Sequence, residues 1–305
     1  MTDVSLKEYL TARLKGAGAS AVGFATAGEV DGEASTRFRS WLAQGREGEL
    51  GYMRSYPDLR RDPRLLLEGA RTVVSAAWCY LPPQLRDGSL PVVARYAYGR
   101  DYHKALRSLI KPICRDLEAN FGCRWRICID SAPIAERYWA VKSGVGFIGR
   151  NGCLIVPGVG SWVFLSEILL TAVTEPDAPL PMDCDGCDAC RRQCPGGAIG
   201  ADRTVDVRRC LSACTVEGTP YPDVHTERPH LLGCDRCQEV CPHNRGAAPS
   251  SWMRPLDGIL SLDDGELRAM DDGEFARRFA GTSFMRPGRD RLLSNLCFWE
   301  NSRLP

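Results

Sequence analysis

The sequence predicts an α+β protein of three consecutive parts, and three observations carry this prediction. Helical and strand-like patterns alternate through the first 174 residues, cysteines crowd between Cys184 and Cys241, and a charged stretch with short helical patterns follows. Hydrophobic residues make up 44% of the 305 residues, which is enough for a buried core. We therefore expect a layered N-terminal α/β domain over residues 1–175, a cysteine-rich domain over 176–250 and a helical segment over 251–305.

The first elements are predicted from capping residues and apolar periodicity. Ser5 can cap a helix that ends at Gly16, because apolar residues recur behind it at helical spacing. A short strand is expected over 21–24 and a helix over 36–44. A nearly continuous apolar run over 72–80 predicts a buried strand, which two prolines stop.

The later elements follow from the same patterns. A long helix is expected over 101–121, and Pro112 should kink or divide it. A strand over 125–129 precedes a helix over 131–143, which Ser131 can cap. The remaining strand-like runs are 153–156 and 162–171, and the remaining helical patterns are 263–270, 273–279 and 290–299.

The cysteine-rich part contains two motifs that end in Cys-Pro. The first, C-x2-C-x2-C-x3-C-P, ends at Pro195, and the second, C-x2-C-x3-C-P, ends at Pro242, with Cys210 upstream. The first matches the run with which bacterial ferredoxins bind 4Fe–4S clusters. Short spacings let one loop wrap three corners of a cluster, while the fourth cysteine reaches the other cluster. The motifs therefore predict two 4Fe–4S clusters in a ferredoxin-like domain.

The ligand sets of the two clusters are expected to cross. One cluster takes Cys184, Cys187, Cys190 and Cys241, and the other takes Cys194, Cys210, Cys234 and Cys237. Cys214 lies one helical turn after Cys210 and could replace it. Structural zinc is the alternative metal, because paired cysteines at this spacing also suit zinc. Six further cysteines are expected to be small buried residues: Cys79, Cys114, Cys123, Cys128, Cys153 and Cys297.

The net charge and the hydropathy of the sequence limit which partners and which cellular compartment are expected. The net charge of +1 creates no overall field toward RNA or a membrane. No apolar stretch approaches the ~20 residues of a membrane span, and the first seven residues contain no apolar run typical of a leader. We therefore expect a cytoplasmic monomer without a membrane partner. Fifteen cysteines in a reducing compartment favour metal binding over disulfides.

Asp130 is a candidate general acid, because it follows the strand expected over 125–129. A carboxylic acid in a cleft can donate a proton when burial raises its pKa. The ordinary alternative is a helix-capping aspartate, since Ser131 and Pro133 follow as they do at helix starts. Spacing alone favours the cap.

Five motifs together resemble the epoxyqueuosine reductases, enzymes that complete queuosine in the tRNA anticodon. The motifs are AYGRDYHK at 97–104, DSAPIAER at 130–137, GVGFIGRN at 144–151, GSWVFLSE at 160–167 and GCDRCQEVCP at 233–242. Their order and spacing agree with the family over nearly the whole chain. Ser166 departs from the glycine usual in the family, and Arg150 stands where lysine is frequent.

The resemblance implies an oxidoreductase that reduces epoxyqueuosine to queuosine in tRNA. An external donor would supply electrons, which pass through the two clusters to cobalamin bound in the N-terminal α/β domain. Asp130 is implied as the proton donor, so we expect its site to raise its pKa from about 3.9 by burial. The implied pocket residues around the corrin and the substrate are Tyr96, Asp101, His103, Arg137, Asn151 and Ser161.

Two other functions remain open on the sequence alone. A reductive dehalogenase-like enzyme would share cobalamin and two clusters, and an iron–sulfur electron-transfer protein would perform no catalysis. RNA binding has its own candidates in the basic residues Arg60, Arg61 and Arg64, although exposed arginines are usually only solvated.

Overall fold

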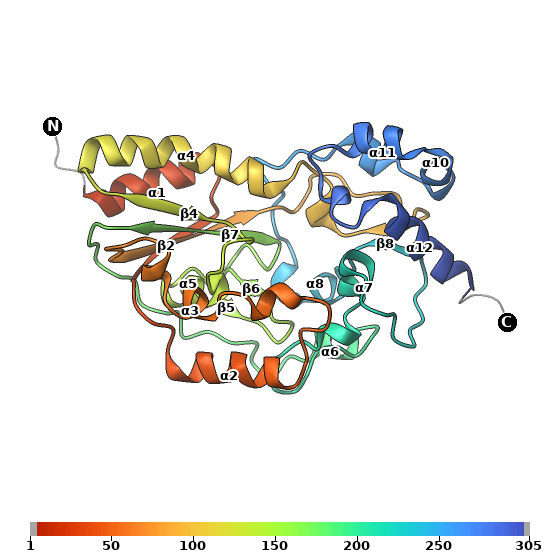
Figure 1. The fold of residues 1–305 in the computed structure, drawn as a ribbon, viewed down its shortest axis with the longest axis horizontal. Coiled ribbons are helices and arrows are strands. Elements are labelled where there is room, and N and C mark those ends of the chain that lie inside the picture. Colours follow the sequence, from red (N-terminus) through yellow and green to blue (C-terminus); the bar gives the residue numbers. More distant parts are fainter. Residues whose placement is uncertain (1–4, 302–305) are drawn as a thin grey trace.

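A four-stranded antiparallel sheet forms the centre of the N-terminal half in the computed structural model, which describes residues 5–301. Residues 1–4, part of the stretch in which no leader is expected, lie outside this range. The strands are ordered β1 (Ala21–Thr26), β2 (Thr72–Cys79), β7 (Val163–Leu170) and β4 (Trp125–Cys128) (Figure 1). The predicted mixture of helix and sheet is confirmed.

Two helices, α1 (Leu6–Gly16) and α4 (Tyr102–Phe121), cover one face of this sheet (Figure 1). Ser5 caps α1 as expected, because its side chain accepts a hydrogen bond from the Glu8 N–H. Trp78 points into the same layer, and its indole N–H donates to the Ser166 hydroxyl at 2.9 Å. The serine that replaces the usual family glycine therefore satisfies a buried donor.

The helix α4 is not divided at Pro112, contrary to one of the two outcomes expected for this residue. Pro112 lies on the exposed side of the helix, and so does Ser108, whose carbonyl loses its partner. Water can satisfy that carbonyl, while the buried residues Ile110 and Ile113 hold the helix to the core on either side.

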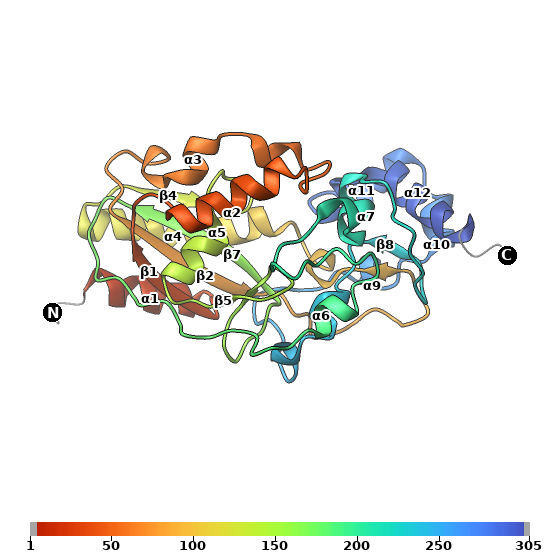
Figure 2. The ribbon, with the colours of Figure 1, turned by 90° about the horizontal axis from the view of Figure 1, so that it is seen from below.

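The other face of the sheet carries α5 (Glu136–Lys142), which packs on β7 and β2. The helix predicted over 131–143 was wrong in its start, because it begins five residues later and Ser131 does not cap it. Asp130 adopts a left-handed backbone with φ 44°, and this turns the chain into an irregular loop before the helix. The helices α2 (Gly32–Ala43) and α3 (Pro57–Arg61) lie on the same side as α5 (Figure 2). The short strands β5 (Phe147–Ile148) and β6 (Leu154–Ile155) pair with each other nearby.

The cysteine motifs lie on short helices and loops at the other end of the molecule (Figures 1 and 2). β3 (Val92–Val93) pairs in parallel with β8 (His230–Leu232), so the N-terminal half and the cysteine-rich part share a small sheet. The remaining helices are α6 (Ala189–Arg192), α7 (Leu211–Glu217), α8 (Arg236–Glu239), α9 (Asp257–Leu260), α10 (Asp264–Ala269), α11 (Asp272–Phe279) and α12 (Gly288–Asn301). No helix within residues 5–301 is long and apolar enough to cross a bilayer.

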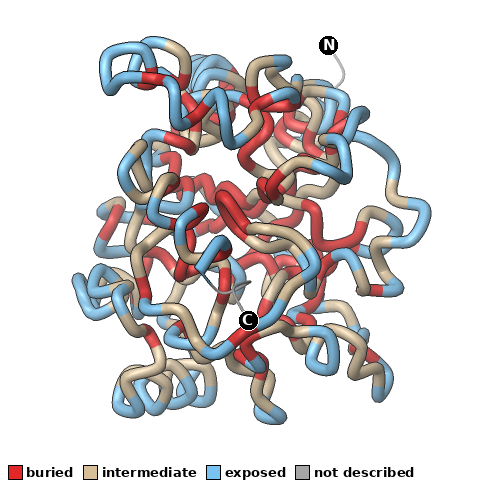
Figure 3. Tube along the Cα trace, turned by 90° about the vertical axis from the view of Figure 1, so that its right-hand side faces the viewer, coloured by how far each residue is buried: buried red, intermediate tan, exposed pale blue. Residues whose placement is uncertain are grey.

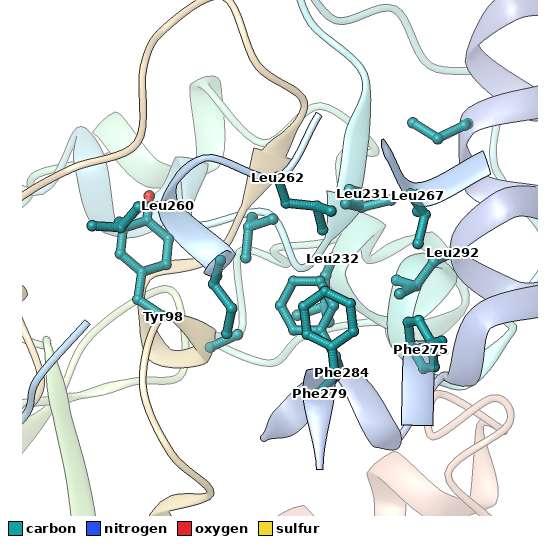
Figure 4. Close-up of a cluster of buried hydrophobic side chains, with 14 of the residues drawn as sticks. Tyr98, Leu231, Leu232, Leu260, Leu262, Leu267, Phe275, Phe279, Phe284 and Leu292 are labelled. Carbon is teal, nitrogen blue, oxygen red and sulfur yellow. The ribbon is translucent and has the colours of Figure 1, made fainter. Parts of the chain in front are cut away.

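One buried core, which we call the shared core, draws side chains from all three predicted parts of the chain. It combines Tyr98 of the N-terminal half, Leu231 and Leu232 of β8, and the aromatic rings of Phe279 and Phe284 (Figure 4). Buried backbone runs through the middle of the molecule, and exposed loops surround it (Figure 3). The boundaries expected at residues 175 and 250 stay predictions, but the parts that they separate pack as neighbours.

Truncation inside the shared core should destabilise the protein strongly. Phe284 is 0% exposed and stacks on Phe279, so Phe284→Ala removes a ring from a closed packing arrangement. We expect a loss of about 3–5 kcal/mol in the free energy of unfolding, measured by anaerobic urea denaturation. The matched change Phe121→Ala, at a ring that is 37% exposed, should cost clearly less. Equal losses would mean that Phe284 does not anchor the core.

Candidate active site

Asp130 is held at the end of β4 by two side chains from the first turn of α4. Its carboxylate accepts a hydrogen bond from the Tyr102 hydroxyl at 2.7 Å and contacts His103 Nε2 at 2.9 Å. The carboxylate side chain remains 53% exposed. Because α5 begins only at Glu136 and has no side-chain cap, Asp130 is not the helix cap that spacing alone favoured.

The His103 imidazole lies between two carboxylates. Asp101 caps α4 by accepting the His103 backbone N–H at 2.9 Å, and the same oxygen lies 2.9 Å from Nδ1 of the ring. The hydrogen bond with Asp130 raises the pKa of His103, and the bond with Asp101 adds to the rise against the effect of burial. The ring is therefore biased toward its charged form.

The pKa of Asp130 is lowered, which is opposite to the expected direction. Burial is the largest single effect on this pKa and raises it. The hydrogen bonds from His103 and Tyr102, followed by the charges of His103 and Arg137, together outweigh burial and lower it. In this structure the proton of the pair therefore resides on His103 rather than on Asp130.

A cavity of about 220 Å³ opens beside this acid. Tyr102 and Phe164 form one wall, with stacked rings 4.0 Å apart between centroids. Arg137 forms another part of the lining, and its guanidinium is fixed by a 2.5 Å bond to the Gly152 carbonyl. The cavity thus presents an acid, a phenol, an aromatic face and a fixed cation to any ligand.

The far side of the cavity is connected to the second cysteine motif by hydrogen bonds. Ser161 Oγ donates to Gln238 Oε1 at 2.9 Å, and Gln238 Nε2 donates to the Tyr80 hydroxyl at 3.1 Å. Asn244 Nδ2 donates to Ser161 Oγ at 2.9 Å. Because Gln238 directly follows Cys237, this network places the cysteine-rich part against the cavity.

Electrostatic effects link cysteine thiols within each of the two predicted groups, although within residues 5–301 no three Cys, His, Asp or Glu side chains are arranged to hold a single metal ion. Burial raises the pKa of Cys190, and the negative charges of Cys184, Cys241 and Cys187 raise it further. Such effects require neighbouring sulfurs, and these are the members of one predicted ligand set.

The second group contains Cys194, Cys210, Cys234 and Cys237. Burial raises the pKa of Cys234, and the charges of Cys210 and Cys194 add to it. Burial likewise raises the pKa of Cys237, and the charges of Cys153, Cys234 and Cys210 add to the rise in that order. These charge effects agree with the crossed pattern, and the ligand assignment itself stays a prediction.

The Cys214 thiol forms hydrogen bonds with backbone carbonyls. Its thiol donates to the carbonyl oxygens of Cys210 at 3.3 Å and Pro220 at 3.4 Å, and it packs beside Leu211 and Trp299. Backbone N–H groups at the start of α7 instead act on the Cys210 sulfur and lower its otherwise raised pKa. This arrangement favours Cys210 over Cys214 as the ligand.

The other predicted pocket residues are distributed around the cavity. Arg137 and Ser161 line it with Asp130. His103 lies outside the lining and contacts Asp130, and Asp101 contacts His103 in turn. Tyr96 packs toward Gly233 outside the lining. Asn151 also lies outside the lining, is 7% exposed, and has an amide nitrogen without a hydrogen-bond partner among the described residues.

Several lining residues were not predicted as site residues. Tyr102 and Glu136 stand inside the recognised motifs, so adjacency to His103 and Arg137 was the available signal. Cys153 lines the cavity instead of lying in the core, and Cys297 is exposed, so the prediction of small buried cysteines was wrong for these two. Neither position shows a sequence signal that separates it from an ordinary core cysteine.

Comparison with known proteins identifies the family. A model described as epoxyqueuosine reductase QueG, DUF1730, matches residues 60–131. A protein of Gloeobacter violaceus named epoxyqueuosine reductase is 36% identical over 93% of this chain and 94% of its own length. The chain belongs to the epoxyqueuosine reductase family. A second relative of that name, from Shewanella oneidensis, is 33% identical over 97% of this chain and 80% of its own length.

Solved structures and a second family model extend the likeness. A model described as a 4Fe–4S double cluster binding domain matches residues 183–244, which decides against zinc. A crystal structure of epoxyqueuosine reductase with an epoxyqueuosine-modified tRNA-Tyr stem loop superposes with a TM-score of 0.84, at 29% identity over 95% of this chain and 79% of that one. The Bacillus subtilis enzyme, with its catalytic aspartate loop swung out of the active site, superposes with a TM-score of 0.85 at 28% identity, over 95% of this chain and 79% of that one.

Family membership also decides between the remaining functions. The curated relatives are reductases, so a cluster protein without catalysis is not supported. Their shared name refers to epoxyqueuosine and not to a halogenated compound, so the dehalogenase alternative is not supported either.

The two carboxylates should give His103 a measurably raised pKa. We expect histidine-selective NMR to show titration above the ordinary value of about 6.5, and Asp130→Asn to lower that pKa more than Asp101→Asn does. The folded-state pKa is the higher one, so this pairing stabilises the fold below about pH 6.5 and is lost as pH rises through the raised value. Titration of His103 at its ordinary pKa would contradict the pairing.

Proposed function

We propose that this chain reduces epoxyqueuosine to queuosine in the anticodon of tRNA. The observation that carries the proposal is the Asp130 carboxylate, held by Tyr102 and His103 at a cavity that hydrogen bonds connect to the cysteine motifs. Removal of an epoxide oxygen needs electrons and a proton at one place, and this arrangement brings the two sources together.

The layout expected from the sequence serves this reaction. The N-terminal part, residues 1–175, binds cobalamin and substrate, and residues 176–250 bind the two clusters. Buried residues of the C-terminal segment between Met253 and Leu296 complete the shared core. An external donor loads the clusters. This donor, the monomeric state and the cytoplasmic location stay predictions.

The cysteines present the chemistry that iron–sulfur clusters need. Cys184, Cys187, Cys190 and Cys241 bind one cluster, and Cys194, Cys210, Cys234 and Cys237 bind the other. The Cys194 sulfur already accepts the Ala198 N–H at 3.2 Å, the kind of hydrogen bond that tunes cluster potentials. The mutual charge effects within each set support this division.

Two buried donors outside the cavity lining suit the amide side chains of cobalamin. Asn151 Nδ2 and Arg150 Nε are buried without partners among the described residues, and both can donate to amide oxygens. The cavity of about 220 Å³ holds the reacting part of a ligand and not a whole cobalamin. Asn151, Ser161, Arg137 and Tyr96 would hold the cofactor, whose reduced cobalt supplies the electrons for C–O cleavage when it is bound.

Asp130 and His103 hold and transfer the proton that the epoxide oxygen receives. Asp130 is half exposed, and a substrate that covers it removes water and adds to the burial that already raises its pKa. The proton then moves from His103 to Asp130, which delivers it to the epoxide oxygen as the C–O bond breaks. Tyr102 keeps the carboxylate oriented by its 2.7 Å hydrogen bond.

Arg60 is the basic residue best placed to contact the RNA. It belongs to α3, and the charges of Asp130 and Glu136 act on its pKa, which burial lowers. Arg61 and Arg64 instead lie near Glu29 and Asp62 at 3.4 and 2.7 Å. Arg60 donates to the carbonyls of Ser55 at 3.2 Å and Tyr52 at 3.1 Å rather than to a carboxylate. A cation that is not paired with an acid in this way suits a backbone phosphate next to the reacting nucleotide.

Replacement of Cys194 by serine tests the crossed clusters. Cys194→Ser should damage the cluster that Cys210, Cys234 and Cys237 share, and leave the one bound by the neighbours of Cys194 in the first motif. Iron counting and electron paramagnetic resonance of the reduced protein distinguish the two. Cys214→Ser is the control and should keep both clusters, because its thiol is bonded to carbonyls. Loss of the first cluster instead of the second would overturn the assignment.

Conversion of an epoxyqueuosine-containing anticodon stem-loop RNA tests the function and the acid together. The parent, loaded with clusters and cobalamin and chemically reduced, should form queuosine detectable by mass spectrometry. Asp130→Asn keeps the shape but cannot donate the acid proton, so single-turnover rates should fall by about 10²–10⁴. Cluster and cobalamin absorption should be unchanged in this variant. A rate equal to the parent's would remove Asp130 from the mechanism.

A further inference from the structure

Two acids, one at the cavity and one buried behind it, have no part in the chemistry described so far. Glu167 stands in the middle of β7 and is 0% exposed, and neither of its carboxyl oxygens has a hydrogen-bond partner among the described residues. Buried polar groups in folded proteins are almost always paired, so an unpaired carboxyl calls for an explanation. Glu136 begins α5 and lines the cavity together with Asp130.

The sheet directs Glu167 toward α5. Leu165 and Leu169, which share its face of β7, pack in the two clusters that include residues of α5. In register, Glu167 lies opposite Ser75 on β2 and Cys128 on β4. The Ser75 hydroxyl also has no partner within residues 5–301. A small polar site therefore lies inside an otherwise apolar layer, behind the first residue of α5.

Each of the three acids affects the pKa of the next one, from Asp130 at the cavity to Glu136 and then to Glu167. Burial raises the pKa of Glu136 to about 7, and the charge of Asp130 contributes to the rise. Burial also raises the pKa of Glu167, and the charge of Glu136 contributes. Three cationic groups face Glu136 and lower its pKa: Arg137, His103 and Arg60. Burial thus favours the protonated form of Glu167, and a pKa of about 7 places Glu136 close to its midpoint at neutral pH.

We propose that Glu136 and Glu167 form a proton reserve that reloads Asp130 during turnover. The inference rests on the proposed function, because removal of an epoxide oxygen as water takes two electrons and two protons. The first proton reaches the oxygen as one C–O bond breaks, and a hydroxyl remains. The second proton turns that hydroxyl into water as the other C–O bond breaks and the C=C bond forms.

A single carboxyl supplies one of these two protons at a time. Asp130 must therefore be reprotonated between the two steps, while the substrate covers it and keeps bulk water away. Glu136 is the neighbouring acid on the inner side, and Glu167 behind it refills Glu136. The burial of Glu167 would explain how it serves as a reserve, because a buried carboxyl keeps its proton until a neighbouring carboxylate accepts it.

The test measures single-turnover reduction of epoxyqueuosine-containing stem-loop RNA by the loaded enzyme across pH. The parent rate should fall as pH rises through about 7, where Glu136 loses its proton. Glu136→Gln and Glu167→Gln keep size but carry no acidic proton, so rates should drop by roughly 10²-fold and this pH dependence should disappear. Glu136→Asp restores an acid and should recover part of the rate and the dependence. Glu33→Gln, at an 83% exposed side chain on α2, should match the parent.

Infrared spectroscopy provides a second readout that does not depend on turnover. The parent should show a protonated-carboxyl band at pH 7 that Glu167→Gln removes and Glu33→Gln keeps, with cluster absorption confirming that each variant is folded. An active parent whose two glutamine variants keep its rate and pH profile would overturn the reserve alone, and so would the absence of the band. A loaded parent that leaves the RNA unchanged would instead remove the proposed function, and the reserve with it.

Discussion

The shared core sets the geometry on which the rest of the structure depends. Rings from the C-terminal helices close over β8 and over the turn that contains Tyr98, so the cysteine-rich part cannot shift relative to the N-terminal sheet without opening that core. Ser161 and Gln238 then need only one hydrogen bond to define the boundary between the cavity and the second motif. Apolar burial supplies the free energy of the arrangement, and the polar network gives it precision.

Ionisable groups lie at and near the cavity, and their different environments give them different pKa values. His103 gains affinity from two carboxylates, Asp130 loses it to its hydrogen-bond donors, and Glu136 and Glu167 gain it through burial. Differences of this kind assign acid and base roles at a fixed pH without any metal at the acid itself. Gln238, next to the second cysteine motif, and Glu136, at the start of α5, both line this cavity.

Features that depend on residues close together in the sequence could be predicted. Features that depend on contacts between remote residues could not. Cysteine spacing is a property of a short loop, so the domain that binds two 4Fe–4S clusters could be anticipated. The start of α5 could not, because the left-handed backbone of Asp130 is set by side chains of α4 that are remote in sequence. The direction of the Asp130 pKa was missed for the same reason. In the sequence, Glu167 looks like an ordinary strand residue. Its position between β2 and β4 follows only from the strand register.

The shared core also has a consequence for biosynthesis. A ribosome adds about 5–20 residues per second, so several seconds separate the appearance of Cys241 from that of Leu296, one of the last buried residues of that core. Until α12 emerges, the cysteine loops lack the packing that shields them in the finished protein. The nascent thiols are therefore most open to oxygen, and also to the machinery that inserts iron and sulfide, during this interval. Cluster insertion and the final step of folding thus compete in time, and a slower final stretch of translation lengthens the period in which insertion can occur.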